Sequence, residues 1–564
     1  MNMNRIRGIE HMKMVKVNYR GIETKEFLED TSLLEISDSF KKYYNYPILV
    51  SKVDNDITGL AELVTKKSDI DFYDRSSVIG NTIYARSAQF ILIVAVKQVL
   101  GEGAEVIIEH SIDKGVYCEI KNCDIDKPVL RKIESKMHEI VAEDLKFTKV
   151  SVSRIDAIKY FRKKKRMDKV NVLKYISNTY VNLYRLDDVY DYFYGELAYS
   201  TKAIDDFKLT YIKDNGFVLS CPDIYNPECT LDYKHHKMLF DTFLDYTKWG
   251  RILKISNAAD LNEVVSTGKY GDLIRISEAY YNGQLSEIAD RVYDNKKNIK
   301  IILIAGPSSS GKTTTSKKLE IYLKSKGLRT HQISIDDYFI NRDKTPLDEH
   351  GERDLESLRA VDIDLLNRHL IKLFDGEKVL LPEYNFMTGE REYRKKWLQM
   401  DEDDIIIIEG LHALNEDLTI SIPRRNKFKI YISPLTQLNI DNHNHIHTSD
   451  TRKLRRIIRD NKFRNYNAAD TLKMWEKISY GEERYIFPFQ DDADMIINSA
   501  LVYELGVLKT YAEPLLFSVS ENDPVYPEAL RLINFLRNFL PIPSEEVPDD
   551  SVLREFIGNS CFYE

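Results

Sequence analysis

The residues best suited to chemistry form one glycine- and serine-rich segment, Gly306-Pro307-Ser308-Ser309-Ser310-Gly311-Lys312-Thr313. It fits the pattern G-x-x-x-x-G-K-[ST]. In such a loop the backbone N–H groups surround phosphate oxygens, the lysine reaches the terminal phosphates, and the last hydroxyl binds Mg²⁺. The alternative is a turn that binds nothing. The pattern predicts a nucleoside triphosphate site made by Gly306, Ser308, Ser309, Ser310, Gly311, Lys312, Thr313 and Thr314.

Carboxylates follow two apolar runs further along the chain. Asp336 comes after residues 331–335, and Glu409 comes after residues 404–408. Because the carboxyl ends of parallel strands line the ligand-binding edge of an α/β sheet, both are expected beside the phosphate loop. Asp336 could accept the proton of an acceptor hydroxyl and help to hold a metal, and Glu409 fits a second metal position. The alternative is that both are solvated charges at strand ends.

Four arginines recur at helical spacing a little further on: Arg452, Arg455, Arg456 and Arg459. A solvated basic helix is one interpretation. Guanidinium groups present forked donors that suit phosphate, so a helix of this kind can also close over a nucleotide as a lid. The spacing favours the lid.

These groups need a frame to hold them. Residues 299–305, rich in isoleucine, predict a buried parallel strand that leads into the loop, and residues 314–326 predict a helix that stops at Gly327. Strands and helices alternate to about residue 518. This alternation is typical of an α/β domain with a parallel sheet flanked by helices.

Bulk properties narrow the class of protein. The chain has 564 residues, of which 30% are charged, and a net charge of −8, which argues against a surface dominated by nucleic-acid binding. Its five cysteines are sparse and odd in number. We find no apolar leader, and the longest apolar run, residues 90–96, is too short to cross a bilayer. We expect a cytoplasmic protein with several domains, reduced thiols and no membrane contact.

The C-terminal half resembles the uridine kinase and phosphoribulokinase family of P-loop kinases. Besides the loop, the resemblance rests on residues 334–339, 382–386 and 408–410 and on the arginine helix. It implies ATP and Mg²⁺ as cofactors and a small nucleoside or sugar as the acceptor. It further implies that Asp336 is the catalytic base and that Thr313 and Glu409 are metal partners. Acceptor-pocket walls and lid cations are implied at Tyr384, Phe386, Arg452, Arg455 and Arg456.

The acceptor region departs from this family. Arg359 falls where pyrimidine nucleoside kinases place a carboxylate that grips the ribose hydroxyls, with Glu356 and Asp362 nearby. A guanidinium only donates hydrogen bonds, so it suits an anionic acceptor, unless Arg359 points away and a nearby carboxylate takes the sugar. We therefore predict that uridine and cytidine are poor acceptors.

The first 250 residues resemble the two N-terminal modules of threonyl-tRNA synthetase, a ubiquitin-like α+β TGS domain and an α+β editing-type domain. Arg86 and Phe90 stand where the editing motif has histidines, and Phe193 and Leu197 stand where it has a cysteine and a histidine. The resemblance implies a retained fold without editing or zinc. Within the first module, residues 33–44 predict a helix capped by Asp30 or Thr31.

Three other clusters have two interpretations each. The basic run 162–166 is either a solvated helix end, which we favour, or an RNA contact. Cys221, Cys229, His235 and His236 match no common zinc spacing. The histidines at 443, 445 and 447 predict a polar surface loop rather than a metal site.

We therefore divide the chain into five segments: a TGS-like domain (12–75), an editing-like domain (76–250), a helical connector (251–298), a kinase domain (299–520) and a C-terminal helix with its tail (521–564). The prediction is a kinase that phosphorylates a hydroxyl of a nucleoside or ribose-like sugar. The rival is an RNA- or ribosome-associated ATPase switch that binds RNA through its N-terminal half. The oligomeric state is left open.

Overall fold

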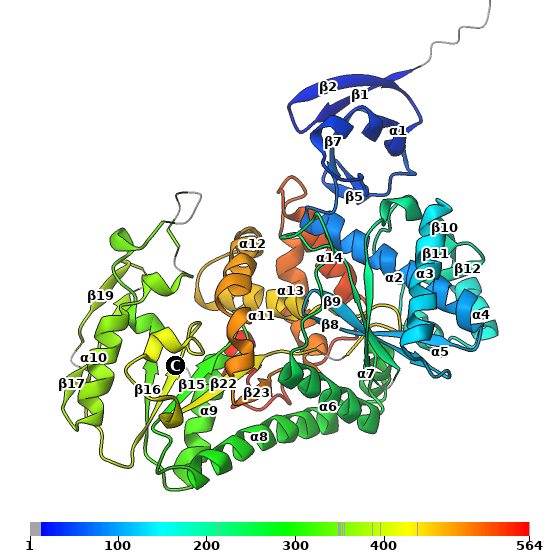
Figure 1. The fold of residues 1–564 in the computed structure, drawn as a ribbon. Helices are drawn as coiled ribbons and strands as arrows, with labels where there is room; N and C mark the ends of the chain where they lie inside the picture. Colours follow the sequence, from blue (N-terminus) through cyan, green and yellow to red (C-terminus); the bar gives the residue numbers. More distant parts are fainter. Residues whose placement is uncertain are drawn as a thin grey trace, which may run out of the picture.

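The computed structural model describes residues 13–213, 215–347, 351, 353–354, 356–385, 387–394, 396–436 and 438–562. They form a mixed α/β protein. Figure 1 shows a small N-terminal unit at the top, a second unit below it to the right, and a unit built on a parallel sheet at the left.

The N-terminal unit is a mixed sheet of order β2-β1-β7-β4-β5 beside one short helix. Its strands are Met14–Tyr19 (β1), Glu23–Leu28 (β2), Val50–Val53 (β4), Asp56–Thr58 (β5) and Ser68–Tyr73 (β7). The predicted helix was too long and its cap was misplaced. Helix α1 spans Leu33–Asp38, and Ser32 caps its N-terminus. The helix ends early because Phe40 turns inward and stacks on Tyr19 with ring centroids 4.4 Å apart. A 3₁₀ turn, Lys41–Tyr43, follows.

Two antiparallel sheets and two long helices form the second unit. The sheets have the orders β13-β14-β9-β8 and β10-β11-β12. The strands are Glu105–Ile112 (β8), Gly115–Lys121 (β9), Thr148–Ser153 (β10), Tyr180–Leu186 (β11), Val189–Tyr192 (β12), Lys208–Lys213 (β13) and Gly216–Ser220 (β14). The helices are Val78–Leu100 (α2), Lys127–Ala142 (α3), Arg154–Lys163 (α4) and Met167–Lys174 (α5).

Helix α2 is the one described helix whose length and apolar composition would suffice to cross a membrane. Two thirds of its apolar window is buried inside the protein. Within this fold it therefore acts as the central core helix of the second unit.

Three helices connect the halves: Lys237–Leu253 (α6), Ala258–Ser266 (α7) and Tyr270–Asp294 (α8). Helix α8 runs along the base of the molecule and packs against α9, Lys312–Ser325 (Figure 1).

The C-terminal unit is built on a five-stranded parallel sheet of order β16-β21-β15-β22-β23. The strands are Ile301–Ala305 (β15), Thr330–Ser334 (β16), Ile405–Glu409 (β21), Lys427–Ser433 (β22) and Met495–Asn498 (β23). The helices include Ile363–Phe374 (α10), Thr448–Phe463 (α11) and Ala468–Tyr485 (α12). Because all five strands point the same way, their carboxyl ends meet at one edge.

The C-terminal residues are not a free tail. Helices Glu504–Phe517 (α13) and Tyr526–Leu536 (α14) pack against each other, and the chain then returns to the parallel sheet, where Arg554–Ile557 form a short helix, α15. Lys317 Nζ, on helix α9, donates to the Phe562 carbonyl at 2.7 Å. The chain therefore ends beside the phosphate loop, as the mark C in Figure 1 shows.

The predicted surface loop with the three histidines is wrong. Residues 438–447 lie between the two halves, and both His443 and His445 are buried. His443 contacts Asp191 from β12, while Lys169 from α5 pairs with Asp191 at 2.8 Å and with Asp441 at 2.9 Å. Polar sequence predicts exposure, but here each polar group has a partner from the other half.

This segment leads directly into helix α11, which carries the arginines. Asn439 Nδ2 donates to the Ile108 and Glu109 carbonyls, and the Asn442 carbonyl accepts from the Ile108 N–H at 2.8 Å. The N-terminal half thus fixes the segment that precedes the arginine helix.

Candidate active site

The predicted phosphate loop joins β15 to α9, as the pattern requires. Gly306 lies so close to β22 that an added Cβ would approach the Ile432 carbonyl oxygen to 2.0 Å. Gly311 has a φ of +88°, a conformation that only glycine adopts without strain. These two glycines let the backbone wrap tightly around the place where phosphates bind.

Lys312 and two carboxylates share one electrostatic environment. Lys312 Nζ donates to the Gly306 and Pro307 carbonyls, at 2.9 and 3.1 Å. Burial lowers the pKa of Lys312, although Glu409 and Asp336 oppose that change. Burial and the nearby Asp336 raise the pKa of Glu409 to about 7. The structure therefore brings together three residues that stand far apart in the sequence.

Asp336 lies just beyond β16, in a 3₁₀ turn spanning Ile335–Tyr338. Its side chain is accessible to solvent, yet protein atoms surround it closely enough to raise its pKa against the influence of Lys312 and Arg464. The carboxylate touches water on one side while protein atoms limit its solvation on the others. A raised pKa suits a general base.

Oxygen donors suited to Mg²⁺ surround this point. Thr313 offers a hydroxyl, Asp336 and Glu409 offer carboxylates, and Ser334 Oγ donates to Glu409 at 3.2 Å. Within the described residues no group of three or more His, Cys, Asp or Glu side chains is placed to hold a metal. Mg²⁺ commonly binds through one or two carboxylates plus substrate phosphates, so the donor set fits that ion.

All three predicted lid arginines contact the phosphate loop, two of them at Ser308. Arg452 Nε donates to the Ser308 carbonyl at 3.0 Å, and Arg456 donates to the Ser308 hydroxyl. Arg455 differs from the prediction. It is fully buried and pairs with Glu504 at 2.7 Å, and its guanidinium donates to the Ser309 carbonyl. Arg455 therefore braces the loop from behind, because its side of α11 faces α13 rather than the site.

Two carboxylates that the sequence did not point to contact the loop. Glu482 on α12 accepts the Ser308 N–H at 2.8 Å and pairs with Arg452. Glu555 on α15 accepts from the Thr314 N–H at 3.1 Å and from its hydroxyl at 2.7 Å. Neither belongs to a recognisable motif, and both arrive from helices far along the chain.

The acceptor side holds Arg359 and its two neighbouring carboxylates. Arg359 is exposed, and its side chain forms no hydrogen bond or ion pair with the described residues of the site. Asp362 caps α10 and pairs with Arg391 at 2.9 Å. Glu356 is the carboxylate that shares the charge environment of the site. Burial and Glu482 raise its pKa to about 7, and Arg456, Asp336 and Lys312 also act on it.

Tyr384 lies in a short hairpin, β18 (Glu383–Asn385) with β19 (Glu390–Glu392). It is buried, and its ring packs edge-on against Phe339 at 5.5 Å. The Tyr384 N–H donates to Asp337 at 3.4 Å. Tyr384 thus sits beside the segment that holds Asp336, whereas Phe386 lies outside the described residues.

Aromatic side chains fill the second unit at the positions of the editing motif. Phe90 on α2 packs against Phe193 with centroids 5.2 Å apart, and both rings are buried with Leu197. Arg86 donates to the Glu196 carbonyl at 2.9 Å and lies over the Tyr194 ring. These residues form a packed apolar core with a braced arginine, which offers no group for hydrolysis.

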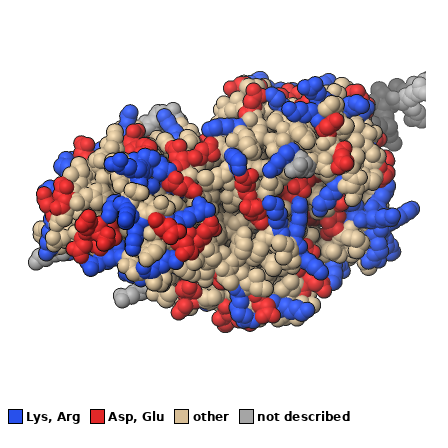
Figure 2. Space-filling model, turned by 60° about the horizontal axis from the view of Figure 1, so that its bottom comes forward, with Lys and Arg blue, Asp and Glu red and all other residues tan. Residues whose placement is uncertain are grey.

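Most of the basic run of the N-terminal half faces solvent, and His236 has acidic partners. Arg162 to Lys165 form the exposed end of α4, on the side where Figure 2 shows basic side chains gathered at the right-hand edge. His236 contacts Asp491 at 2.7 Å and lies near Asp113.

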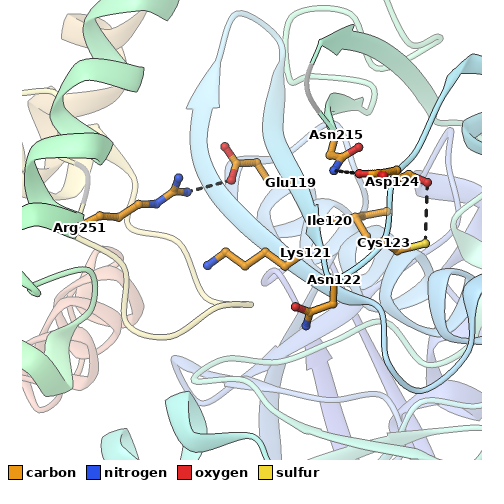
Figure 3. A pocket seen from close by; sticks show the side chains of 8 residues that line it. All are labelled: Glu119, Ile120, Lys121, Asn122, Cys123, Asp124, Asn215 and Arg251. Atoms are coloured by element: carbon orange, nitrogen blue, oxygen red, sulfur yellow. Dashed lines mark hydrogen bonds and ion pairs between the residues drawn. The ribbon is translucent and has the colours of Figure 1, made fainter.

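One pocket lies away from the phosphate loop. It has a volume of about 620 Å³, at the end of β9 and opposite Arg251 on α6. Figure 3 shows Arg251 reaching Glu119, while Lys121 and Asn122 line the floor. Of its charged groups, Arg251 and Glu119 pair with each other at 2.8 Å.

Comparison with known proteins separates the two halves of the chain. Residues 301–504 match the phosphoribulokinase / uridine kinase family. The C-terminal half therefore contains a region similar to this kinase family. A uridine kinase of Staphylococcus epidermidis is 29% identical over 201 residues, which cover 35% of this chain and 86% of that protein. A solved structure described as a possible uridine kinase from Bacillus stearothermophilus is 21% identical, covers 36% of this chain and 89% of its own, and has a TM-score of 0.23.

The rest of the chain, outside the kinase domain, has a different relative. A threonine–tRNA ligase of Desulforamulus reducens is 25% identical over 204 residues, or 35% of this chain. The match spans about a third of the ligase, 32% of its length. The predicted fusion of synthetase-like modules to a kinase-family domain is confirmed at this level.

Proposed function

We propose that this protein is an ATP- and Mg²⁺-dependent kinase that transfers the γ-phosphoryl group to a hydroxyl of a nucleoside or ribose-like sugar. The observation that carries the proposal is the convergence of Lys312, Asp336 and Glu409 beside a complete phosphate loop. A phosphoryl-transfer site needs a cradle, a cation for the terminal phosphates, a base and metal ligands, and each has a candidate here.

In the proposed reaction the acceptor oxygen bonds to the γ-phosphorus as the bond from that phosphorus to the β-phosphate oxygen breaks. Asp336 takes the hydroxyl proton, and ADP leaves. Lys312 and Arg456 offset the negative charge that spreads over the moving group. Bound Mg²⁺, held by Thr313, Asp336 and Glu409, would neutralise charge on the terminal phosphates.

The acceptor is proposed to be a neutral polyol. The prediction against uridine placed Arg359 on the sugar. The exposed Arg359 side chain supports the alternative, in which a nearby carboxylate takes the sugar. Glu356 shares the charge environment of the site, and a carboxylate accepts hydrogen bonds from two sugar hydroxyls.

The test is a screen of Mg²⁺-ATP with uridine, cytidine, purine nucleosides, ribose and a phosphorylated sugar, in which acceptor-stimulated ADP release is measured. We expect a nucleoside to give the highest kcat/KM, at about 10⁴ M⁻¹s⁻¹ or more. Stimulation by the phosphorylated sugar alone would contradict the assignment to Glu356. Hydrolysis that no acceptor changes would contradict the kinase.

A second candidate is an ATPase switch that binds RNA through the N-terminal half. It is favoured by the exposed basic end of α4 and by the likeness to threonine–tRNA ligase. RNA-stimulated hydrolysis, lost when Arg162, Lys163, Lys164 and Lys165 are all replaced by Ala, would support it over the kinase.

A further inference from the structure

The C-terminal residues 549–562 form part of the wall of the phosphate loop. A Cβ added to Gly311 would meet Val552 Cγ2 at 2.4 Å. Asp550 pairs with Lys318 on α9 at 2.9 Å, and Lys317 holds the Phe562 carbonyl. The segment therefore contacts the loop and the helix that the loop begins.

Within this segment Glu555 takes up donors that a nucleotide needs. Its carboxylate accepts from both the N–H and the hydroxyl of Thr314, in the first turn of the 14-residue helix α9. An N–H at this position of a phosphate loop points at the phosphates, where the helix dipole also favours an anion. The single Thr314 N–H cannot donate a full hydrogen bond to a carboxylate and to a phosphate at the same time.

Glu555 is also part of the charge environment of the site. Its carboxylate opposes the lowering of the Lys312 pKa and contributes to the raised pKa of Glu409. A phosphate brought to Lys312 would therefore meet a like charge in a partly desolvated place, which is costly.

The same segment contacts the arginine helix. Lys462 Nζ donates to the Ile557 carbonyl at 2.7 Å, and the Arg455 guanidinium lies 5.0 Å from the Phe556 ring centroid. A movement of α15 would thus change contacts both at the loop and at α11.

We propose that residues 549–562 are an intrasteric gate, in which the Glu555 carboxylate occupies a nucleotide-phosphate position and must leave before nucleotide binds. This inference rests on the proposed nucleotide site but concerns its regulation. It assigns to the C-terminal segment a role that the kinase pattern does not require.

The first test measures Mg²⁺-ADP affinity of the full chain by calorimetry. Glu555→Ala should bind about tenfold or more tightly than the wild type, because a charged hydrogen bond no longer competes. Glu555→Gln, which keeps an acceptor without the charge, should lie between them. Glu545→Gln changes an exposed carboxylate just before this segment, is the matched control and should bind as the wild type does.

Unchanged or weaker binding by Glu555→Ala, with the folded state verified by circular dichroism, would overturn the gate and make Glu555 a support of the loop. If neither the wild type nor any variant binds Mg²⁺-ADP, the nucleotide site itself is refuted, and the gate with it.

A second test uses the wild type alone. Amide hydrogen exchange in residues 549–562 should become faster at saturating Mg²⁺-ADP, since the gate opens as nucleotide enters. Slower exchange would show that nucleotide tightens the segment, and unchanged exchange that it never leaves; either would overturn the proposal.

Discussion

The phosphate loop and the interior of the second unit occupy comparable places, each at the meeting point of a sheet and a long helix, yet they differ in what they bury. Around the loop, charged groups converge from six elements, and several have displaced pKa values. Around Phe90 the matching positions are apolar and packed at van der Waals contact.

This contrast indicates which half of the fused chain keeps reactive side chains. Desolvated, unbalanced charge costs stability, so a fold keeps it where it serves a reaction. Aromatic packing gains stability but supplies no base, nucleophile or metal ligand. The synthetase-like half is therefore expected to stabilise and position, and the kinase-family half to react.

The boundary between these regions should show the largest effect. Lys169 is completely buried between two carboxylates, which raise its pKa despite burial. Lys169→Ala leaves Asp191 and Asp441 without their cation and should lower the free energy of unfolding by about 3–5 kcal/mol. Urea denaturation followed by circular dichroism measures this. Lys163→Ala, at the exposed end of α4, is the control, and equal losses in both variants would show that the buried ion pairs do not matter.

Phe90→Ala tests the structural side of the comparison. Removing this buried ring should lower the free energy of unfolding by about 3–5 kcal/mol while kcat/KM with the true acceptor changes less than about twofold. Tyr180→Ala removes an aromatic ring that is 64% exposed and should change neither quantity. A large fall in kcat/KM for Phe90→Ala at a temperature where it is folded would contradict a purely structural role.

Asp336→Asn tests the reactive side and should give the opposite result. We expect turnover to fall by roughly 10²-fold or more, because the base is lost, with thermal stability unchanged. Asp337→Asn is the matched control, since its carboxylate only supports the Tyr384 backbone, and should cost less than about tenfold. Near-normal turnover of Asp336→Asn would reassign the base.

Acid stability should show the smallest effect, at the anchor of the arginine helix. Burial opposes ionisation of Glu528, but Arg531 and Lys453 prevail and lower its pKa to about 2. A carboxyl with a lowered pKa in the folded state adds stability above its unfolded pKa of about 4.3, and loses it as pH falls toward 2. Glu528→Gln should flatten the fall in unfolding free energy over that window by on the order of 1 kcal/mol, discounting for partial exposure.

Parallel denaturation curves for Glu528→Gln and the wild type between pH 4.5 and 2 would contradict that expectation. Glu545→Gln serves again as the control, because Glu545 is exposed and should not alter the slope.

Local sequence determined the phosphate loop and its flanking elements. The loop depends on the backbone freedom of Gly306 and Gly311 and on the side chain of Lys312, all within eight residues. Its pattern can therefore be recognised from the sequence alone. The strands at residues 299–305 and 404–408 could also be predicted, because short runs rich in isoleucine are typical of buried parallel strands. Asp336 and Glu409 followed from their places at strand ends.

Which charged side chains contact the site depends on the tertiary structure. Arg455 and Arg456 are neighbours in sequence, yet one pairs with Glu504 inside the protein and the other reaches Ser308. Glu356 shares the charge environment of Lys312, and Glu482 and Glu555 reach the loop from distant helices. A side chain's partners depend on packing between elements far apart in the chain, and residue type and spacing carry no record of that packing.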